Sequence, residues 1–218
     1  MSELIVTCEH ASDHIPAEMR KRMEIPADIE LHRIYDKGAL ESAKTFASAH
    51  GLMVHDFQLS RLLIDANRSL TNRSLFSEFA RKLTEKERLN LLREHYIPFR
   101  MAVIKEISSM KQAVHLSFHS FTPVMDGKVR GFDIGILYDP KRPQEAETAK
   151  RIIKYLSEKT GLTVLGNAPY KGTSDGHTTA LRKDFAPDSY IGLEIEFSQR
   201  LTTDAMKTAA RAMAAFFQ

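Results

Sequence analysis

The feature that most constrains this chain is an alternation of short β-rich runs with longer segments of helical character. The β-rich runs are mostly apolar, and they lie at Leu4–Cys8, Leu52–Phe57, Arg61–Ile64, Ala113–His119, Phe132–Tyr138, Leu162–Leu165 and Tyr190–Phe197. The segments with helical signals lie at Ala27–Arg33, Tyr35–Ala49, Thr84–Met110, Glu145–Lys159 and Thr203–Phe217. Strands that alternate with helices predict an α/β fold in which a mainly parallel sheet is covered on both faces.

The segment from Thr84 to Met110 has the clearest boundary signals. Thr84 and Glu87 have the spacing of a capping box, which satisfies backbone donors at a helix start. Pro98 lies inside the same segment and lacks a backbone N–H. We therefore expect this helix to be kinked or divided near Pro98.

Length and composition predict one soluble domain. The chain has 218 residues, 43% of them apolar, with no internal repeat, low-complexity tract or linker. A chain of this length can bury one large core, so we predict a single domain over residues 1–218. Scattered apolar helix faces fit a monomer and a dimer equally well, and the oligomeric state stays open.

Charge and targeting signals exclude several classes of partner. The formal net charge of +3 is small and dispersed, whereas nucleic-acid binding needs a clustered basic face. No apolar stretch approaches the roughly 18 residues that span a bilayer, and the first residues lack a signal-peptide pattern. The only cysteine, Cys8, cannot form an internal disulfide, which suits a reducing compartment. We expect a cytoplasmic protein, with no nucleic acid or membrane as partner and Cys8 as a buried core residue.

Histidines and an acidic residue follow two of the predicted strands. His10 and Asp13 lie three residues apart after the first strand, and His119 ends the run that starts at Ala113. Ligands of open α/β sheets bind at the carboxyl edge of the strands. Two histidines and a carboxylate, with one position left for water, are the ligands of a catalytic zinc site. The alternative is a chance spacing among nine histidines, with the strand-end imidazole merely hydrogen-bonded.

The segment that follows Arg61–Ile64 presents Asp65, Asn67 and Arg68 in close succession. Arginine offers a planar fork that binds a carboxylate through two hydrogen bonds, and asparagine adds a further donor. This pattern predicts a site for a substrate carboxylate. The alternative is a strand-end turn in which Asn67 is left-handed and Arg68 lies on the surface.

Two glutamates interrupt an apolar strand near the end of the chain. Glu194 and Glu196 are two residues apart, so they point to the same face of the predicted strand Tyr190–Phe197. An unpaired buried charge is costly, so these carboxylates must be paired or used. One of them is a candidate general base. The alternative is the solvated face of an edge strand.

Taken together, these stretches resemble the N-formylglutamate amidohydrolase family. No single stretch is specific, but the resemblance rests on six of them in a fixed order: Cys8–Pro16, Ser60–Arg68, Ser117–Pro123, Gly131–Asp139, Asn167–Tyr170 and Leu193–Phe197. The family in turn resembles the zinc carboxypeptidases. Their chain order is a His-x-x-Glu pair, an Asp-x-Asn-Arg motif, a strand-end Ile-His-Ser and a late glutamate.

The resemblance implies a fold, a metal and a reaction. The implied fold is a zinc-peptidase-like three-layer α/β/α sandwich with a mixed, mainly parallel sheet. The implied cofactor is one zinc ion per chain. The implied reaction is hydrolysis of the amide of a small carboxylate-bearing substrate, which for N-formylglutamate gives formate and glutamate. The residues implied as zinc ligands are His10, His119 and Asp13.

The same resemblance implies the other roles at the site. Asn67 and Arg68 would hold the substrate carboxylate, and Glu196 would be the base. Beyond what the resemblance implies, we hypothesise that Arg61 or Arg182 stabilises the oxyanion and that Tyr170 closes the pocket.

Two departures from the family pattern leave alternatives open. Other members carry Pro-His-Ser-Gly where this chain has Glu9–Ser12, so the acyl group and the amino acid of the substrate stay open. Asp13 stands where a longer glutamate is expected, and Asp36 is the alternative ligand. Glu194 is the alternative base. Two alternative functions stay open. One is an amidase or peptidase that acts on another carboxylate-bearing substrate, and the other is a non-catalytic protein of the same fold that binds a carboxylate through Asn67 and Arg68.

Overall fold

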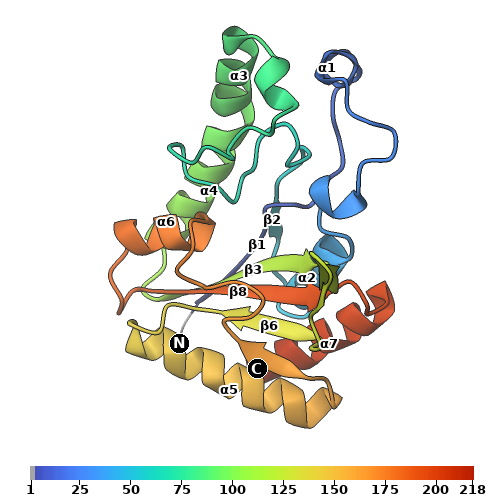
Figure 1. Ribbon diagram of the computed structural model, residues 1–218. Helices are drawn as coiled ribbons and strands as arrows, with labels where there is room; N and C mark the ends of the chain where they lie inside the picture. The colour runs from blue at the N-terminus through green and yellow to red at the C-terminus, as the bar shows by residue number, and fades with distance from the viewer. Residues whose placement is uncertain (1–2) are drawn as a thin grey trace.

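The computed structural model describes residues 3–218, and its centre is a six-stranded sheet with the order β2-β1-β3-β8-β6-β7 (Figure 1). The bounds of these strands are β1 (Glu3–Cys8), β2 (Val54–Asp56), β3 (Ala113–Phe121), β6 (Ile134–Leu137), β7 (Val164–Gly166) and β8 (Tyr190–Ser198). β1, β2, β3 and β8 are mutually parallel, β6 runs antiparallel to β8, and β7 is parallel to β6. The sheet is therefore mixed and mostly parallel.

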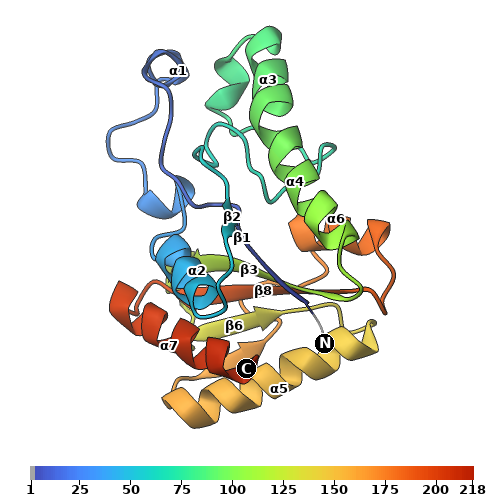
Figure 2. The same ribbon diagram turned by 180° about the vertical axis from the view of Figure 1, so that it is seen from behind.

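Helices cover both faces of this sheet, as Figures 1 and 2 show. On one side lie α2 (Ala39–Ser48), α5 (Pro143–Thr160) and α7 (Thr203–Phe216), which share one apolar cluster with the strands. On the other side lie α4 (Ile97–Ser108) and α6 (His177–Asp184), with a smaller apolar cluster at the amino-terminal end of the sheet. The predicted three-layer α/β/α arrangement is confirmed.

The remaining elements stand beyond the carboxyl ends of β1 and β3 or beside the sheet. They are α1 (Ala17–Met23), η1 (Leu31–Arg33), η2 (Ala80–Lys82), α3 (Glu85–Leu91), the π-helix η3 (Leu92–Tyr96) and the hairpin β4 (Val124–Met125) with β5 (Lys128–Val129). A separate apolar cluster, which we call the upper apolar cluster, includes Met23, Leu63 and Leu83. It packs these helices against the segment that follows β2. The single domain predicted over residues 1–218 stays a prediction, and residues 1–2 lie outside the described part.

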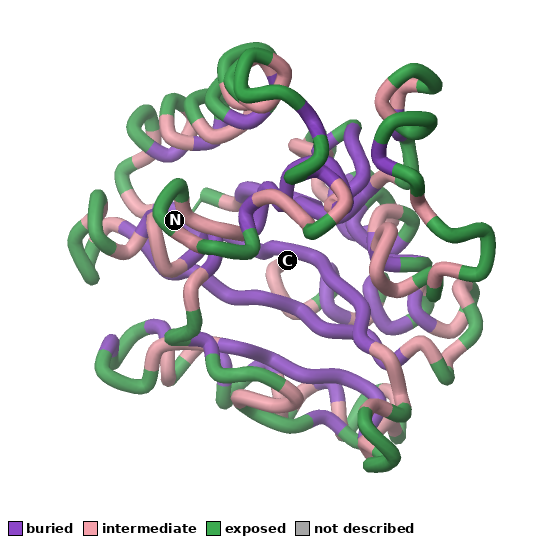
Figure 3. Tube along the Cα trace, turned by 45° about the horizontal axis from the view of Figure 1, so that its top comes forward, coloured by how far each residue is buried: buried purple, intermediate pink, exposed green. Residues whose placement is uncertain are grey.

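Alternation along the strands sends different side chains to the two faces. In β3, Val114, Leu116 and Phe118 join the large apolar cluster, so the residues between them face α4 and α6. In β8, Ile191, Leu193, Ile195 and Phe197 join the same cluster in the same way. Figure 3 shows these strands as a buried band at the centre of the molecule. The opposite face is polar towards the carboxyl ends of the strands.

The register of the central strands places the polar residues side by side. β3 and β8 pair along their whole length, with His119 opposite Glu196 and Ser117 opposite Glu194. Gly135 of β6 pairs with Glu196 on the other side. A Cβ at Gly135 would lie 1.8 Å from the carbonyl oxygen of Ala168, so only glycine lets the 167–171 loop pass here.

Some sequence predictions of secondary structure were wrong. Arg61–Ile64 forms a turn rather than a strand, because Leu62, Leu63 and Ile64 are buried in the upper apolar cluster with no strand beside them. A short apolar run cannot be assigned from periodicity alone. Within Ala27–Arg33 only the short η1 forms, and α1 and α6 were not predicted at all.

The prediction for Thr84–Met110 is confirmed in detail. Thr84 and Glu87 form both hydrogen bonds of a capping box at the start of α3. Before Pro98 the helix widens into η3, where the Ile97 N–H donates to the Leu92 carbonyl five residues back. The wider turn accommodates a residue that has no N–H to donate. Among residues 3–218, no helix is both long enough and apolar enough to cross a membrane.

Candidate active site

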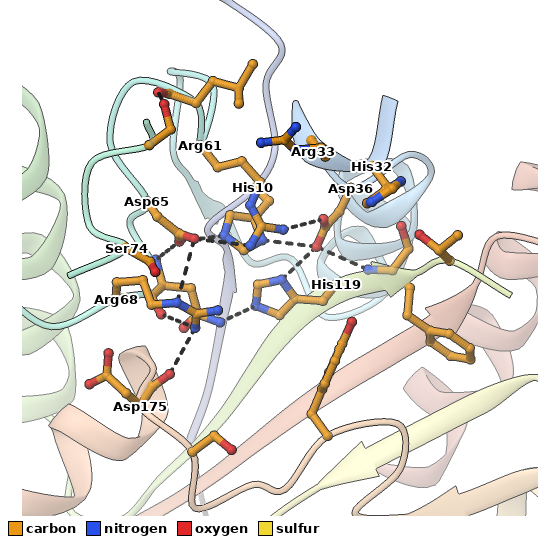
Figure 4. Close-up of a pocket in the computed structure, with 18 of the residues that line it drawn as sticks. His10, His32, Arg33, Asp36, Arg61, Asp65, Arg68, Ser74, His119 and Asp175 are labelled. Atoms are coloured by element: carbon orange, nitrogen blue, oxygen red, sulfur yellow. Dashed lines mark hydrogen bonds and ion pairs between the residues drawn. The ribbon is translucent and has the colours of Figure 1, made fainter. Parts of the chain in front are cut away.

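The structure brings His10 and His119 together at the carboxyl edge of the sheet, and Asp36 completes the group (Figure 4). His10 lies two residues beyond the end of β1, His119 lies in β3, and Asp36 comes from the segment between η1 and α2. Each offers one ligand atom, and these atoms all lie within 4.8 Å of one another. All three side chains are buried.

The donor atoms of this triad converge on one point. Nδ1 of His10 lies 3.1 Å from Oδ2 of Asp36, and Nδ1 of His119 lies 2.9 Å from the same oxygen. Ligands of tetrahedral zinc at roughly 2.0–2.1 Å are about 3.3 Å apart, which is close to these separations. Two imidazole nitrogens and a carboxylate oxygen are also a donor set that zinc accepts. The residues therefore fit a zinc ion.

Each histidine is held on its other ring nitrogen by a further carboxylate. Nε2 of His10 lies 2.7 Å from Oδ1 of Asp65. Nε2 of His119 lies 3.2 Å from Oε2 of Glu9 and 3.0 Å from Oγ of Ser117. Carboxylates in this position fix the orientation and protonation of metal-binding histidines. The arrangement leaves both Nδ1 atoms facing Asp36.

The charges of the group are strongly coupled. Burial disfavours the charged form of Asp36, but the charge of His10 and hydrogen bonds from both histidines hold its pKa well below the ordinary range. Burial opposes ionisation of Asp65 too, yet His10 and Arg61 keep its pKa low. Burial also disfavours a charged His119, but the hydrogen bonds that its ring donates to Asp36 and Glu9 raise its pKa well above the ordinary value. The site thus favours ionised carboxylates and a bound positive charge.

Glu196 lies beside this group without a partner of its own. Its side chain is 5% exposed, and its Oε2 atom is buried with no hydrogen-bond partner in residues 3–218. Burial, with smaller contributions from Asp36 and Glu194, raises the pKa of Glu196 to about 7. A carboxylate with such a pKa can both accept and return a proton near neutrality. Glu194 differs, because its Oε1 accepts a 2.5 Å hydrogen bond from Thr178.

A cleft of about 830 Å³ opens over these residues. Both glutamates of β8 line it, as do the three residues of the triad. The predicted oxyanion residue Arg61 and the predicted substrate-binding residues Asn67, Arg68 and Tyr170 line it too. Its volume is in the range of pockets that hold small organic ligands. Figure 4 shows Arg61 and Arg68 on either side of Asp65 at the wall of this cleft.

Asn67 and Arg68 are held in place by backbone groups. Oδ1 of Asn67 accepts a 2.6 Å hydrogen bond from the His177 N–H at the start of α6. Nη1 of Arg68 donates to the carbonyl oxygens of Asn67 and Asp175 at 3.1 and 3.0 Å. The Arg68 side chain is 30% exposed. These contacts preorganise both side chains at the cleft wall.

Arg61 bridges two of the acidic residues. Its Nη2 lies 3.1 Å from Oδ2 of Asp65, and its Nη1 lies 3.4 Å from Oδ1 of Asp36. Tyr170 also lines the cleft, and the guanidinium of Arg130 is 5.1 Å from its ring centroid. Both side chains therefore face the space in which a substrate would sit.

Two of the predicted site residues lie elsewhere. Asp13 is exposed and does not belong to the triad, because the loop after His10 turns outward before Ile15 becomes buried. Asp36, the alternative, takes that place. Arg182 does not line the cleft. Its guanidinium is bound by the Glu145 carboxylate at 2.8 Å and donates to the Gly192 carbonyl at 2.8 Å, which is a structural role.

Sequence reasoning missed Glu9 and Asp175. Glu9 follows Thr7 on the polar face of β1, and Thr7 pairs with Ser117 of β3, so strand alternation was the available signal. Oδ2 of Asp175 accepts hydrogen bonds from the Ser69 N–H at 3.0 Å and the Asn72 side chain at 2.6 Å. It ties the loop after Arg68 to the start of α6. The sequence carries no local signal for that long-range contact.

Comparison with known proteins decides the family. The sequence profile described as N-formylglutamate amidohydrolase matches residues 2–203. The chain belongs to the N-formylglutamate amidohydrolase family. It is thus a member of a family named for hydrolysis of an amide, and the resemblance stated from its sequence motifs is confirmed. A search of curated proteins found no match.

Solved structures agree with this assignment at the level of the fold. A gene product of Agrobacterium tumefaciens has 27% identity and a TM-score of 0.78, with 100% of this chain and 92% of that chain covered. N-formylglutamate amidohydrolase from Ralstonia eutropha JMP134 has 18% identity and a TM-score of 0.69, with 97% and 90% covered. The mixed sheet with helices on both sides is therefore shared with relatives over nearly their whole length.

Proposed function

We propose that this member of the N-formylglutamate amidohydrolase family is a zinc-dependent hydrolase of a small N-acyl amino acid. The best candidate substrate is N-formylglutamate, which would yield formate and glutamate. The observation that carries the proposal is the convergence of His10, Asp36 and His119 beside Glu196, a buried carboxylate with an unpaired oxygen and a pKa raised to about 7. A protein that only bound a carboxylate would gain nothing from an unpaired buried base.

His10, Asp36 and His119 would hold one zinc ion per chain. When bound, the ion supplies Lewis-acid polarisation of the amide carbonyl and makes water more acidic. Glu196 would take the proton of the attacking water and pass it to the leaving nitrogen. The water oxygen adds to the acyl carbon, the C–N bond breaks, and the products are a carboxylic acid and an amine. The raised pKa of Glu196 suits both transfers.

The other residues of the cleft would bind and orient the substrate. Arg68 and Asn67 are anchored by Asp175 and His177, and they would hold the substrate carboxylate. Fixing the carboxylate places the amide near the reacting groups and lowers the entropic part of the barrier. Arg61 would oppose negative charge that develops on the carbonyl oxygen. Tyr170 would close the outer side of the cleft.

Cleft size favours a second candidate of the same reaction type. N-formylglutamate has only 12 non-hydrogen atoms, whereas 830 Å³ lies towards the upper end of the roughly 300–1,000 Å³ found for ligand pockets. Arg33 and Arg81 also line the cleft. A larger carboxylate-bearing N-acyl amino acid or short peptide would fill that space. The reaction and the zinc ligands would be unchanged.

The deciding experiment combines metal analysis with a substrate screen. Purified protein should contain about one zinc per chain, and His119→Ala should lose it. The screen should start with N-formylglutamate and extend the acyl group and the amino acid separately, with released amine as the readout. Absence of metal, and no uptake of added zinc, would refute the hydrolase and leave a carboxylate-binding protein. Turnover confined to long acyl groups or peptides would select the second candidate.

A further inference from the structure

Behind His119 lies a buried carboxylate that the proposed function does not use. Glu9 directly precedes His10, its side chain is fully buried, and it does not line the cleft. It therefore cannot touch a substrate. Burial of a charge is costly, and such a residue persists only where its hydrogen bonds offset that cost.

The hydrogen bonds and ion pairs of the Glu9 carboxylate are made with residues around the polar face of the sheet. Its Oε1 accepts a 2.6 Å hydrogen bond from Thr7 and lies 2.8 Å from Nδ1 of His177. Its Oε2 accepts a 2.6 Å hydrogen bond from Ser117 and lies 3.2 Å from Nε2 of His119. The carboxylate is thus fixed in position by three residues besides His119. It has no freedom to turn away from the imidazole.

The contact with His119 has a counterpart across the triad. Asp65 faces Nε2 of His10 at 2.7 Å, just as Glu9 faces Nε2 of His119. In both cases the remaining nitrogen, Nδ1, points to Oδ2 of Asp36. A carboxylate that accepts the Nε2 proton leaves the Nδ1 lone pair free for a metal. The sequence assigned a role to the segment Asp65–Arg68, whereas it assigned none to Glu9.

We propose that Glu9 is the positioning residue of His119: it holds the imidazole with its proton on Nε2 and so directs Nδ1 to the metal. The inference rests on the proposed zinc site. It assigns a function to the one residue of the Glu9–Ser12 segment that departs from the usual family pattern and is fully buried. It also explains why Thr7, Ser117 and His177, none of which reaches the cleft, are polar and buried around Glu9.

The test compares two buried glutamates. Glu9→Gln keeps the size of the side chain and removes its charge. Glu145→Gln is the matched control, since Glu145 is also buried but pairs with Arg182 away from the triad. Competition against a chromophoric chelator gives the zinc Kd of each protein. We expect Glu9→Gln to weaken zinc binding about 10- to 100-fold, and Glu145→Gln to leave it within twofold even if stability falls.

A second readout needs no variant. In the ¹⁵N NMR spectrum of the zinc-loaded wild type, Nε2 of His119 should carry a proton that is hydrogen-bonded and slow to exchange. A proton on Nδ1 instead would overturn the inference. So would an unchanged zinc Kd in Glu9→Gln when the wild type binds zinc, and the proposed function would then stand. A wild type that binds no zinc would refute the proposed function and this inference together.

Discussion

The strands β3 and β8 contribute side chains to both faces of the sheet, and the two faces differ in polarity. Towards α2, α5 and α7 they present Val114, Leu116, Phe118 and their neighbours, which form the largest apolar cluster. Towards α4 and α6 the same strands present His115, Ser117, His119, Glu194 and Glu196, all of them buried. A difference of one position along the strand separates a packed core from a candidate catalytic site.

The comparison shows where this fold gains and loses stability. Each large apolar side chain buried on the first face stabilises the fold by roughly 1.5–3 kcal/mol relative to exposure. On the second face, buried polar groups cost free energy unless they are paired. Most are paired there, as in the contacts of Thr7, Glu9 and Ser117. Glu196 is an exception, and we infer that the apolar face offsets what it costs.

The largest effect on the polar face is expected for the base. Glu196→Gln removes the group that would accept the water proton, so kcat should fall by about 10²- to 10⁴-fold while zinc content is unchanged. Steady-state kinetics with metal analysis tests this. Glu194→Gln is the control on the same strand and face, and it should retain far more activity because Glu194 is engaged by Thr178. Near-normal turnover in Glu196→Gln would move the base to Glu194.

The largest effect on the apolar face concerns stability alone. Phe46 of α2 is fully buried, with its ring centroid 5.6 Å from that of Phe118. Phe46→Ala should lower the free energy of unfolding by about 3–5 kcal/mol. Because neither Phe46 nor Phe118 lines the cleft, kcat per folded molecule should not change. Chemical denaturation measures the first quantity, and exposed Met53→Ala should stay within about 0.5 kcal/mol of wild type. A large fall in kcat per folded molecule would break the separation of the two faces.

A smaller effect is expected at the cleft wall. Arg68→Ala should raise KM about 10- to 100-fold, since a charge-assisted hydrogen bond is worth about 1.5–3 kcal/mol. Arg81→Ala is the matched control, because Arg81 lines the same cleft but lies on its exposed outer part. Initial rates over a range of substrate concentrations separate KM from kcat. If Arg68→Ala and Arg81→Ala raised KM equally, the substrate would have to contact Arg81 as well as Arg68. That result would favour the larger N-acyl amino acid or short peptide over N-formylglutamate.

The cost of Glu196 should be visible in the pH dependence of stability. Its pKa is about 7 in the folded protein and about 4.5 in an unfolded chain. The folded state therefore binds the proton more tightly, and this stabilisation is lost as pH rises from about 4.5 through 7. The glutamine of Glu196→Gln does not titrate. In chelator-treated protein, the free energy of unfolding of this variant relative to wild type should therefore increase as pH rises. The gain should be on the order of 1–2 kcal/mol at pH 8.5 and close to zero at pH 4.5, less than the full pKa difference because water can relax around the charge. Equal stability of the two proteins at both pH values would contradict the burial of an unpaired carboxylate.

The sequence predicted what strand alternation controls and missed what the loops control. The apolar pattern of β3 and β8 predicted two strands, and their polar positions predicted His119 and both glutamates on one face. Arg61–Ile64 was predicted as a strand because burial in a turn and burial in a sheet need the same apolar residues. Arg182 was placed at the site because a cation near the end of the chain has no sequence signal for its partner, and Glu145 is 37 residues away.

The candidate metal ligands show the same limit most sharply. His10 lies just beyond the end of β1 and His119 lies near the carboxyl end of β3, so their positions were predictable. Asp36 lies in a loop before α2 and is positioned by long-range contacts, such as the hydrogen bond from its backbone N–H to the His10 carbonyl at 3.0 Å. No local pattern favours it over Asp13, which has the better sequence spacing. The third ligand could only be narrowed to these two residues.

The smallest expected effect distinguishes these two aspartates. Asp13 is exposed and lies outside the triad, so Asp13→Asn should leave zinc Kd and kcat within about twofold of wild type. Asp36→Asn keeps the shape of the side chain but loses the charged oxygen that faces both Nδ1 atoms, and it should release zinc. Elemental analysis and a zinc titration measure both variants. Loss of zinc in Asp13→Asn with retention in Asp36→Asn would mean that the loop after β1 folds inward around the metal. The polar face would then extend past the strand ends, and sequence spacing would have been the better guide to the ligand.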